Sequence, residues 1–60
     1  MIVCQIVTNE SRRHGDITVR VTEAERDRAG SIAQAALIKA DLLGDRKVAY
    51  VRCNGQTYTV

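Results

Sequence analysis

The sequence predicts an α+β fold, a single β-β-α-β-β domain over residues 1–60, with a four-stranded antiparallel sheet and one helix packed on one face of it. Three features predict this fold. Apolar and polar residues alternate after position 16, an apolar period of helical spacing runs from residue 23 to residue 43, and Asn54-Gly55 separates two short strand-like runs. A chain of this length buries only about 60% of the surface that it exposes when unfolded, so we expect a thin margin of stability.

The first two strands are predicted to form a hairpin. Residues 2–8 are rich in β-branched side chains and apolar on both faces, which indicates a central strand. Residues 9–16 contain no apolar side chain and include Gly15, so we expect a long loop there. Residues 17–22 alternate between apolar and polar, the pattern of a strand with one buried and one wet face.

One helix is predicted over residues 23–43. Thr22 and Glu25 have the spacing of a capping box, and Gly44 suits a left-handed C-terminal cap. Gly30 should cost about 1 kcal/mol relative to alanine, so either the backbone passes close to a neighbour or the first two turns bend away from the rest. The stripe with core-facing spacing comprises Ala29, Ile32, Ala33, Ala36, Leu37, Ala40 and Leu43.

A second apolar seam is predicted on the opposite side of this helix, where the sheet cannot reach it. It comprises Ser31, Ala35, Ile38 and Leu42. A contiguous apolar patch of this kind indicates a contact with another protein surface. We expect that surface to be either a second copy, in a homodimer packed helix to helix, or a foreign partner.

The last two strands, residues 47–53 and 56–60, are joined by Asn54-Gly55, the strongest two-residue signal for a type I′ hairpin turn. The register that this turn imposes directs Ala49, Val51, Tyr58 and Val60 to the helix, and Tyr50, Arg52, Thr57 and Thr59 to the open sheet face with Thr18 and Arg20. Two antiparallel strand orders are possible, 2-1-3-4 and 1-2-4-3. The two-sided apolar character of the first strand favours 2-1-3-4.

Charge and composition limit the function classes. Nine Lys plus Arg against seven Asp plus Glu give a formal net charge of +2, well short of a dedicated nucleic-acid binder and of the wrong sign for a DNA mimic. No run reaches the ~20 apolar residues of a membrane span, and we expect no signal peptide, so we expect a cytoplasmic protein. The single histidine, His14, has no oriented partner near it, which argues against an enzyme.

The two cysteines lack the close spacing of a redox or zinc motif, so we expect no metal and no cofactor. Both fall at strand positions compatible with the core. We expect Cys4 and Cys53 to be buried, reduced thiols, with a disulfide as the alternative.

Basic side chains supply a second candidate function. Arg12 and Arg13 lie in the first loop, where they could pair with phosphate or with an acidic protein surface. Arg20, Tyr50 and Arg52 lie on the predicted open sheet face, where one base could stack and a phosphate backbone could be held. A small nucleic-acid-binding or regulatory protein is therefore the alternative to a protein-interaction module.

In size, in β-β-α-β-β order and in mixed charge, the chain resembles the very small phage-encoded inhibitors of bacterial defence, the anti-CRISPR proteins in particular. The local likeness is a first strand, a charged loop ending in Gly15 with Asn9, Ser11 and Arg12, a strand, and an alanine-rich helix. The resemblance implies a non-enzymatic phage or mobile-element protein that binds a host defence complex in the host cytoplasm. It would block nucleic-acid loading or nuclease recruitment by occluding a surface. The partner-binding residues that we predict are Ala35, Ile38, Leu42, Arg12, Arg13, Arg20, Tyr50 and Arg52.

Overall fold

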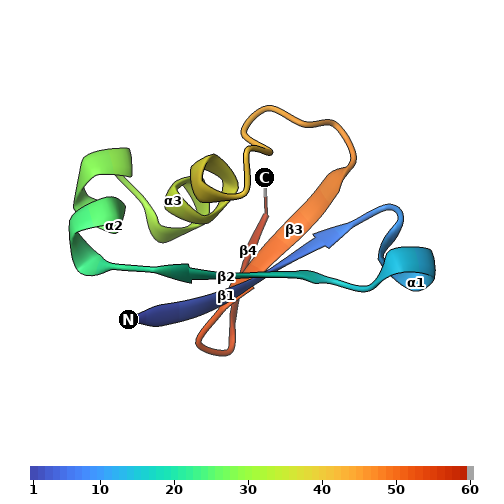
Figure 1. Ribbon diagram of the computed structural model, residues 1–60, viewed down its shortest axis with the longest axis horizontal. Helices are drawn as coiled ribbons and strands as arrows, with labels where there is room; N and C mark the ends of the chain where they lie inside the picture. The colour runs from blue at the N-terminus through green and yellow to red at the C-terminus, as the bar shows by residue number, and fades with distance from the viewer. Residues whose placement is uncertain (60) are drawn as a thin grey trace.

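The structure is a computed structural model that describes residues 1–59, and it confirms an α+β fold built on a four-stranded antiparallel sheet (Figure 1). The elements run β1 (Ile2–Thr8), α1 (Ser11–His14), β2 (Ile17–Val21), α2 (Glu23–Ala29), α3 (Ile32–Lys39), β3 (Val48–Cys53) and β4 (Gln56–Thr59). The strand order is β2-β1-β3-β4, as predicted, so β1 and β3 are the central strands. Helices α2 and α3 lie over one side of the sheet, whereas α1 lies at one end, between β1 and β2. Within residues 1–59, no helix has the length and apolar character needed to cross a bilayer.

The prediction of one helix over residues 23–43 was wrong, because the segment breaks into α2 and α3 at Gly30. Gly30 has a φ of 89° and ends α2, donating its N–H to the carbonyl oxygen of Arg26. Ser31 then begins α3, its hydroxyl accepting from the N–H of Gln34 at 3.1 Å. A Cβ atom on Gly30 would have nothing nearer than 3.9 Å, so the glycine serves its left-handed backbone and not a close approach. Of the two explanations predicted for Gly30, the bend is correct, and it separates α2 completely from α3.

Helix α3 also ends earlier than expected, at Lys39, so Gly44 is not its cap. Asp41 takes the left-handed conformation instead, with a φ of 59°. Its N–H donates to the Ile38 carbonyl, and the N–H of Leu42 donates to the Leu37 carbonyl at 2.7 Å. These two bonds form a Schellman motif, which turns Leu42 back toward the core.

The loop expected over residues 9–16 contains the short helix α1. The Ser11 hydroxyl accepts from the N–H of Thr8 at 2.8 Å, and the carbonyl of Glu10 accepts from both Arg13 and His14. Local hydrogen bonds of polar residues thus organise one turn without any apolar side chain being buried.

The core lies between the sheet and helix α3, whereas α2 packs against α3 and contributes only the partly buried Ala29. Its fully or nearly fully buried residues are Cys4, Ile6, Val21, Ala33, Ala35, Ala36, Leu37, Val51 and Cys53. The predicted core stripe is confirmed at Ala33, Ala36 and Leu37, and Ala29, Ile32 and Ala40 pack against the core while remaining partly exposed. Leu43 is 58% exposed and was assigned wrongly, because α3 has ended before it.

The second hairpin has the predicted turn and register. Asn54 and Gly55 have φ values of 49° and 81°, and Val51 pairs with Tyr58 on the helix side. Ala49 is an exception, because it is exposed instead of facing the helix. A bulge causes this: Val7 pairs with Tyr50 and Thr8 with Val48, which leaves Ala49 between the two pairs. Val60, also predicted to face the helix, lies outside the described residues.

The expected pair of free thiols was wrong, since Cys4 and Cys53 form a disulfide. The two residues are direct partners in the antiparallel pairing of β1 and β3, with their Cα atoms 4.2 Å apart. Both side chains are almost completely buried. The sheet register, which joins residues 49 positions apart, is what brings the sulfur atoms together.

Candidate interaction surfaces

The apolar seam predicted on the outer side of the helix is not a continuous exposed surface. Ala35 is only 4% exposed, because the break at Gly30 lets α2 fold back alongside α3 and cover it. Leu42 lies beyond the end of α3 and packs against the core. Ile38 is 53% exposed and is the member of the predicted patch that faces solvent. Placing Ala35 and Leu42 on an outer surface was therefore wrong, because α2 covers Ala35 and the chain reversal after α3 turns Leu42 onto the core.

A shallow groove of about 140 Å³ remains between α2 and α3. Ala29, Ala35 and Ile38 contribute its apolar lining, and Glu25, Arg28 and Lys39 contribute its charged lining. The groove is open to solvent, and Ile38 is the one large aliphatic side chain in its lining. It is the remnant of the predicted seam.

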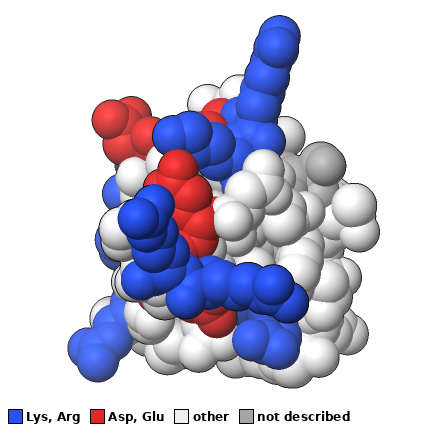
Figure 2. All heavy atoms as spheres, turned by 90° about the vertical axis from the view of Figure 1, so that its right-hand side faces the viewer, with Lys and Arg blue, Asp and Glu red and all other residues white. Residues whose placement is uncertain are grey.

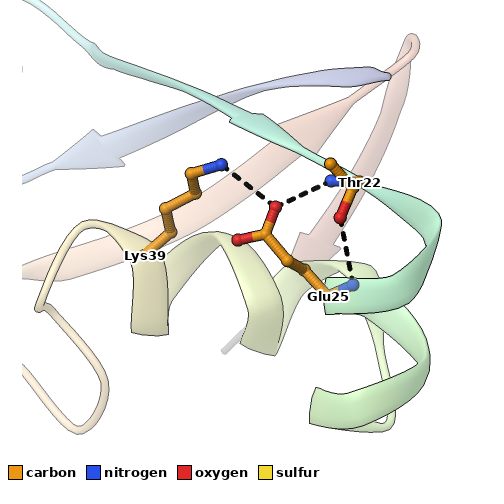
Figure 3. Close-up of polar contacts among 3 residues, drawn as sticks. All are labelled: Thr22, Glu25 and Lys39. Atoms are coloured by element: carbon orange, nitrogen blue, oxygen red, sulfur yellow. Dashed lines mark hydrogen bonds and ion pairs between the residues drawn. The ribbon is translucent and has the colours of Figure 1, made fainter.

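Glu25 organises the polar side of this groove (Figure 3). Its carboxylate accepts from the backbone N–H of Thr22 and from the Lys39 ammonium, each at 3.0 Å, and its own N–H donates to the Thr22 hydroxyl at 3.2 Å. The capping box predicted from the sequence is thereby confirmed. The hydrogen bond from the Thr22 N–H has the largest effect on the pKa of Glu25 and that from Lys39 the next largest, and together they lower it from 4.5 to about 2. The ion pair between Glu25 and Lys39 joins the start of α2 to the end of α3.

The sheet face opposite α2 and α3 is uncovered and carries a mixed surface. Central strand β1 contributes Val3, Gln5 and Val7, and central strand β3 contributes Tyr50 and Arg52. The edge strands contribute Thr18 and Arg20 from β2 and Thr57 and Thr59 from β4. The face therefore has its apolar side chains on the central strands, and it has threonine hydroxyls and the Arg20 guanidinium along the edges.

Two details define the chemical character of this face. Val3 is 47% exposed although it lies on a central strand. The guanidinium of Arg52 donates to the Gln5 side chain at 3.1 Å and lies 3.9 Å from the Asp16 carboxylate, so part of its charge is compensated within the chain. We call Val3, Gln5, Val7, Tyr50 and Arg52 the central patch.

The predicted nucleic-acid residues share this face but do not converge. Arg20 pairs with Val3 at one end of β1, and Tyr50 pairs with Val7 at the other end, with Arg52 between them opposite Gln5. Sheet-based readers of RNA stack two or three bases on aromatic side chains of the sheet, and within residues 1–59 the open face presents one aromatic side chain, Tyr50. Here the predicted groups are spread over the length of the sheet.

The end of the molecule that carries α1 is rich in charge. Figure 2 views this end: Lys and Arg side chains project over one part of it with Asp and Glu between them, while the remaining part is uncharged. Arg12 and Arg13 are exposed, and Lys47 pairs with Glu10 at 3.2 Å. Arg12 and Arg13 make no ion pair with any residue among 1–59, so their charge is available to a ligand.

The described part of the chain contains no cluster of three or more His, Cys, Asp or Glu side chains suited to a metal ion. His14 is exposed on α1. No protein-family model, curated protein or solved structure matches this chain.

Val3 and Val7 were not predicted to belong to an uncovered apolar patch. The signal was present, because residues 2–8 are apolar on both faces, but we took it only as the mark of a central strand. In an all-antiparallel sheet with helices on one side, a strand that is apolar on both faces must present apolar side chains to solvent or to a partner.

Proposed function

We propose that this chain is a small, non-enzymatic protein-interaction module and that its partner binds the open face of the sheet. The observation that carries the proposal is the central patch. Apolar Val3 and Val7 and the aromatic Tyr50 occupy the two central strands, with polar residues around them on the edge strands.

This arrangement has the anatomy of a protein–protein interface. Such interfaces place apolar and aromatic groups at the centre and polar groups at the rim, and tyrosine and arginine carry a disproportionate share of the binding energy. The Arg52 guanidinium is already positioned by Gln5, so it loses little side-chain entropy when a partner binds. The partial neutralisation by Asp16 favours a protein over a polyanion at this face.

For the partner, we propose a bacterial defence complex of the CRISPR-Cas type, occluded by this chain in the host cytoplasm. What supports this is the resemblance to small phage-encoded inhibitors in chain size and in the order of strands around the helical segment. The net charge of +2 favours blocking a protein surface over mimicry of nucleic acid. Expression of the chain in cells whose CRISPR-Cas system clears a targeted plasmid should restore plasmid retention, and unchanged clearance would contradict this choice of partner.

The open face is tested by capture of proteins from a nuclease-treated bacterial lysate with three immobilised forms of the chain. Val3→Glu places a charge in the central patch, whereas Ile38→Glu, the matched control, places the same charge on the helix side at a residue of similar exposure. A protein retained by the wild type and by Ile38→Glu but lost with Val3→Glu supports the proposal. Retention that depends on Ile38 and not on Val3 would move the site to the helices.

A nucleic-acid-binding function is the second candidate, and the free charge of Arg12 and Arg13 on α1 favours it. Its electrostatic contacts release counterions, so binding to oligonucleotides should weaken steeply between about 50 and 200 mM salt. Binding that survives at the upper salt concentration and discriminates among oligonucleotides would establish this function. Weak binding that disappears there and is indifferent to sequence would leave only general electrostatics.

A further inference from the structure

We propose that the edge strand β4 pairs with β4 of a second copy of this chain, antiparallel and about a two-fold axis, so that two sheets join into one of eight strands. This inference concerns an edge of the sheet and does not rest on the proposed function of its open face.

The hairpin geometry shows which backbone groups of β4 point outward. Cys53 and Gln56 flank the two-residue turn and are therefore a hydrogen-bonded pair, and such pairs alternate along an antiparallel ladder. Gln56 and Tyr58 thus bond to β3. Thr57 and Thr59 direct their N–H and C=O groups away from β3, toward the free edge.

These outward groups have no partner within residues 1–59. Proteins commonly protect a free edge with a charged residue, a proline or a bulge, and Gln56–Thr59 has none of these. The other edge strand, β2, carries Arg20 and follows directly after Asp16. β4 is therefore the edge that is open to pairing.

A second copy fits β4 because the strand is complementary to itself. With Tyr58 on the two-fold axis, Thr57 lies opposite the partner's Thr59, and Thr59 lies opposite the partner's Thr57. Each of these two pairs exchanges two backbone hydrogen bonds, giving four in total. Threonine pairs across antiparallel strands are favourable, and no two like charges face each other.

The side chains of β4 also suit the contact. Tyr58 packs on the core side of the sheet but remains partly exposed, and its hydroxyl donates to the Gln56 side chain at 2.9 Å. In the paired sheet, Tyr58 lies opposite the partner's Tyr58, so each ring covers the exposed edge of the other. The interface is isologous and closed, so it yields a dimer and not a filament.

The experiment is sedimentation equilibrium over a wide concentration range, with two variants at one position. Thr57→Pro removes an outward N–H and no bond to β3, whereas Thr57→Val, its matched control, keeps the N–H and a β-branched side chain. We expect a dimer for the wild type and for Thr57→Val. Because two interchain hydrogen bonds are lost per dimer, Thr57→Pro should raise the dissociation constant by about 30-fold or more.

Amide hydrogen exchange of the wild type keeps the test decisive if Thr57→Pro fails to fold. The amides of Thr57 and Thr59 should be protected in concentrated solution and exchange rapidly after dilution, while that of Tyr58 stays protected by β3. The inference is overturned by a wild type that remains monomeric at about 1 mM, by rapid exchange of both threonine amides in a dimer, or by a dimer that Ile38→Glu dissociates.

Discussion

Reduction of the Cys4–Cys53 disulfide should remove about half or more of the stability of this domain. The bond closes a loop with a sequence separation of 49 residues. In the chain-entropy model, a loop of this length restrains the unfolded state by about 14 cal/mol/K, which is about 4 kcal/mol at 25 °C. Domains have roughly 0.05–0.15 kcal/mol of stability per residue, so a chain of 60 residues has only about 3–9 kcal/mol in total. The reduced protein should therefore retain at most about 5 kcal/mol and should be unfolded at the lower end of this range.

The assay is urea unfolding of the oxidised and the reduced protein under otherwise identical conditions, followed by circular dichroism. A double variant, Cys4→Ala with Cys53→Ala, is the control for loss of the cross-link without reductant, and it should be at least as destabilised as the reduced protein. Thiol labelling in denaturant without reductant should find no reactive group. Two labelled thiols per native chain, or unfolding curves that coincide with and without reductant, would refute this reasoning and restore the pair of buried thiols expected from the sequence.

Three further predictions concern the helices. Leu37→Ala should lower the free energy of unfolding by about 2–5 kcal/mol, because Leu37 is 2% exposed in the core. Thr57→Ala, on the sheet surface, should lower it much less, and equal melting temperatures of the two variants would contradict the assignment of faces. The lowered pKa of Glu25 contributes stability that is fully present above the unfolded pKa of 4.5 and is lost as the pH falls toward 2. The melting temperature of the wild type should therefore exceed that of Glu25→Gln above pH 4.5 and approach it as the pH falls toward 2. A difference in melting temperature that does not depend on pH would contradict the lowered pKa. Asp41→Gly should raise the free energy of unfolding by about 1 kcal/mol in urea titrations, because Asp41 holds a left-handed backbone that glycine adopts without strain, and a loss of stability would contradict the Schellman motif.

The features that the sequence predicted correctly depend on neighbouring residues. Two of these features need only a few adjacent positions, the capping box at Thr22 and Glu25 and the turn at Asn54-Gly55. Both were confirmed, and the hairpin has the predicted register. The strand order followed from one strand that is apolar on both faces. Local chemistry and hydrophobic pattern were sufficient for these elements.

The helical segment shows where a local pattern allows two answers. An apolar period continues through Gly30, so periodicity alone predicts one helix, whereas a left-handed glycine followed by the capping Ser31 predicts two. At the other end, Asp41 adopts the conformation that we assigned to Gly44. The break at Gly30 lets α2 pack against α3, and the motif at Asp41 lets Leu42 pack against the core. A one-dimensional pattern contains neither contact.

The candidate surfaces divide in the same way. Tyr50, Arg52 and Arg20 lie on the open sheet face as predicted, because strand alternation determines the face. The predicted exposure of Ala35 was wrong, because it depended on the position of α2. The disulfide was missed because it depends on the relative register of β1 and β3, which no local turn sets.

The central claim is that the open sheet face binds a protein, and photo-crosslinking in bacterial cells tests it most directly. A photoreactive amino acid replaces Val3 in the central patch in one form of the chain and the exposed Gln34 of α3 in another. The account predicts a nuclease-resistant protein adduct from position 3 and none from position 34. Adducts from position 34 alone, or adducts from position 3 that nuclease removes, would contradict it.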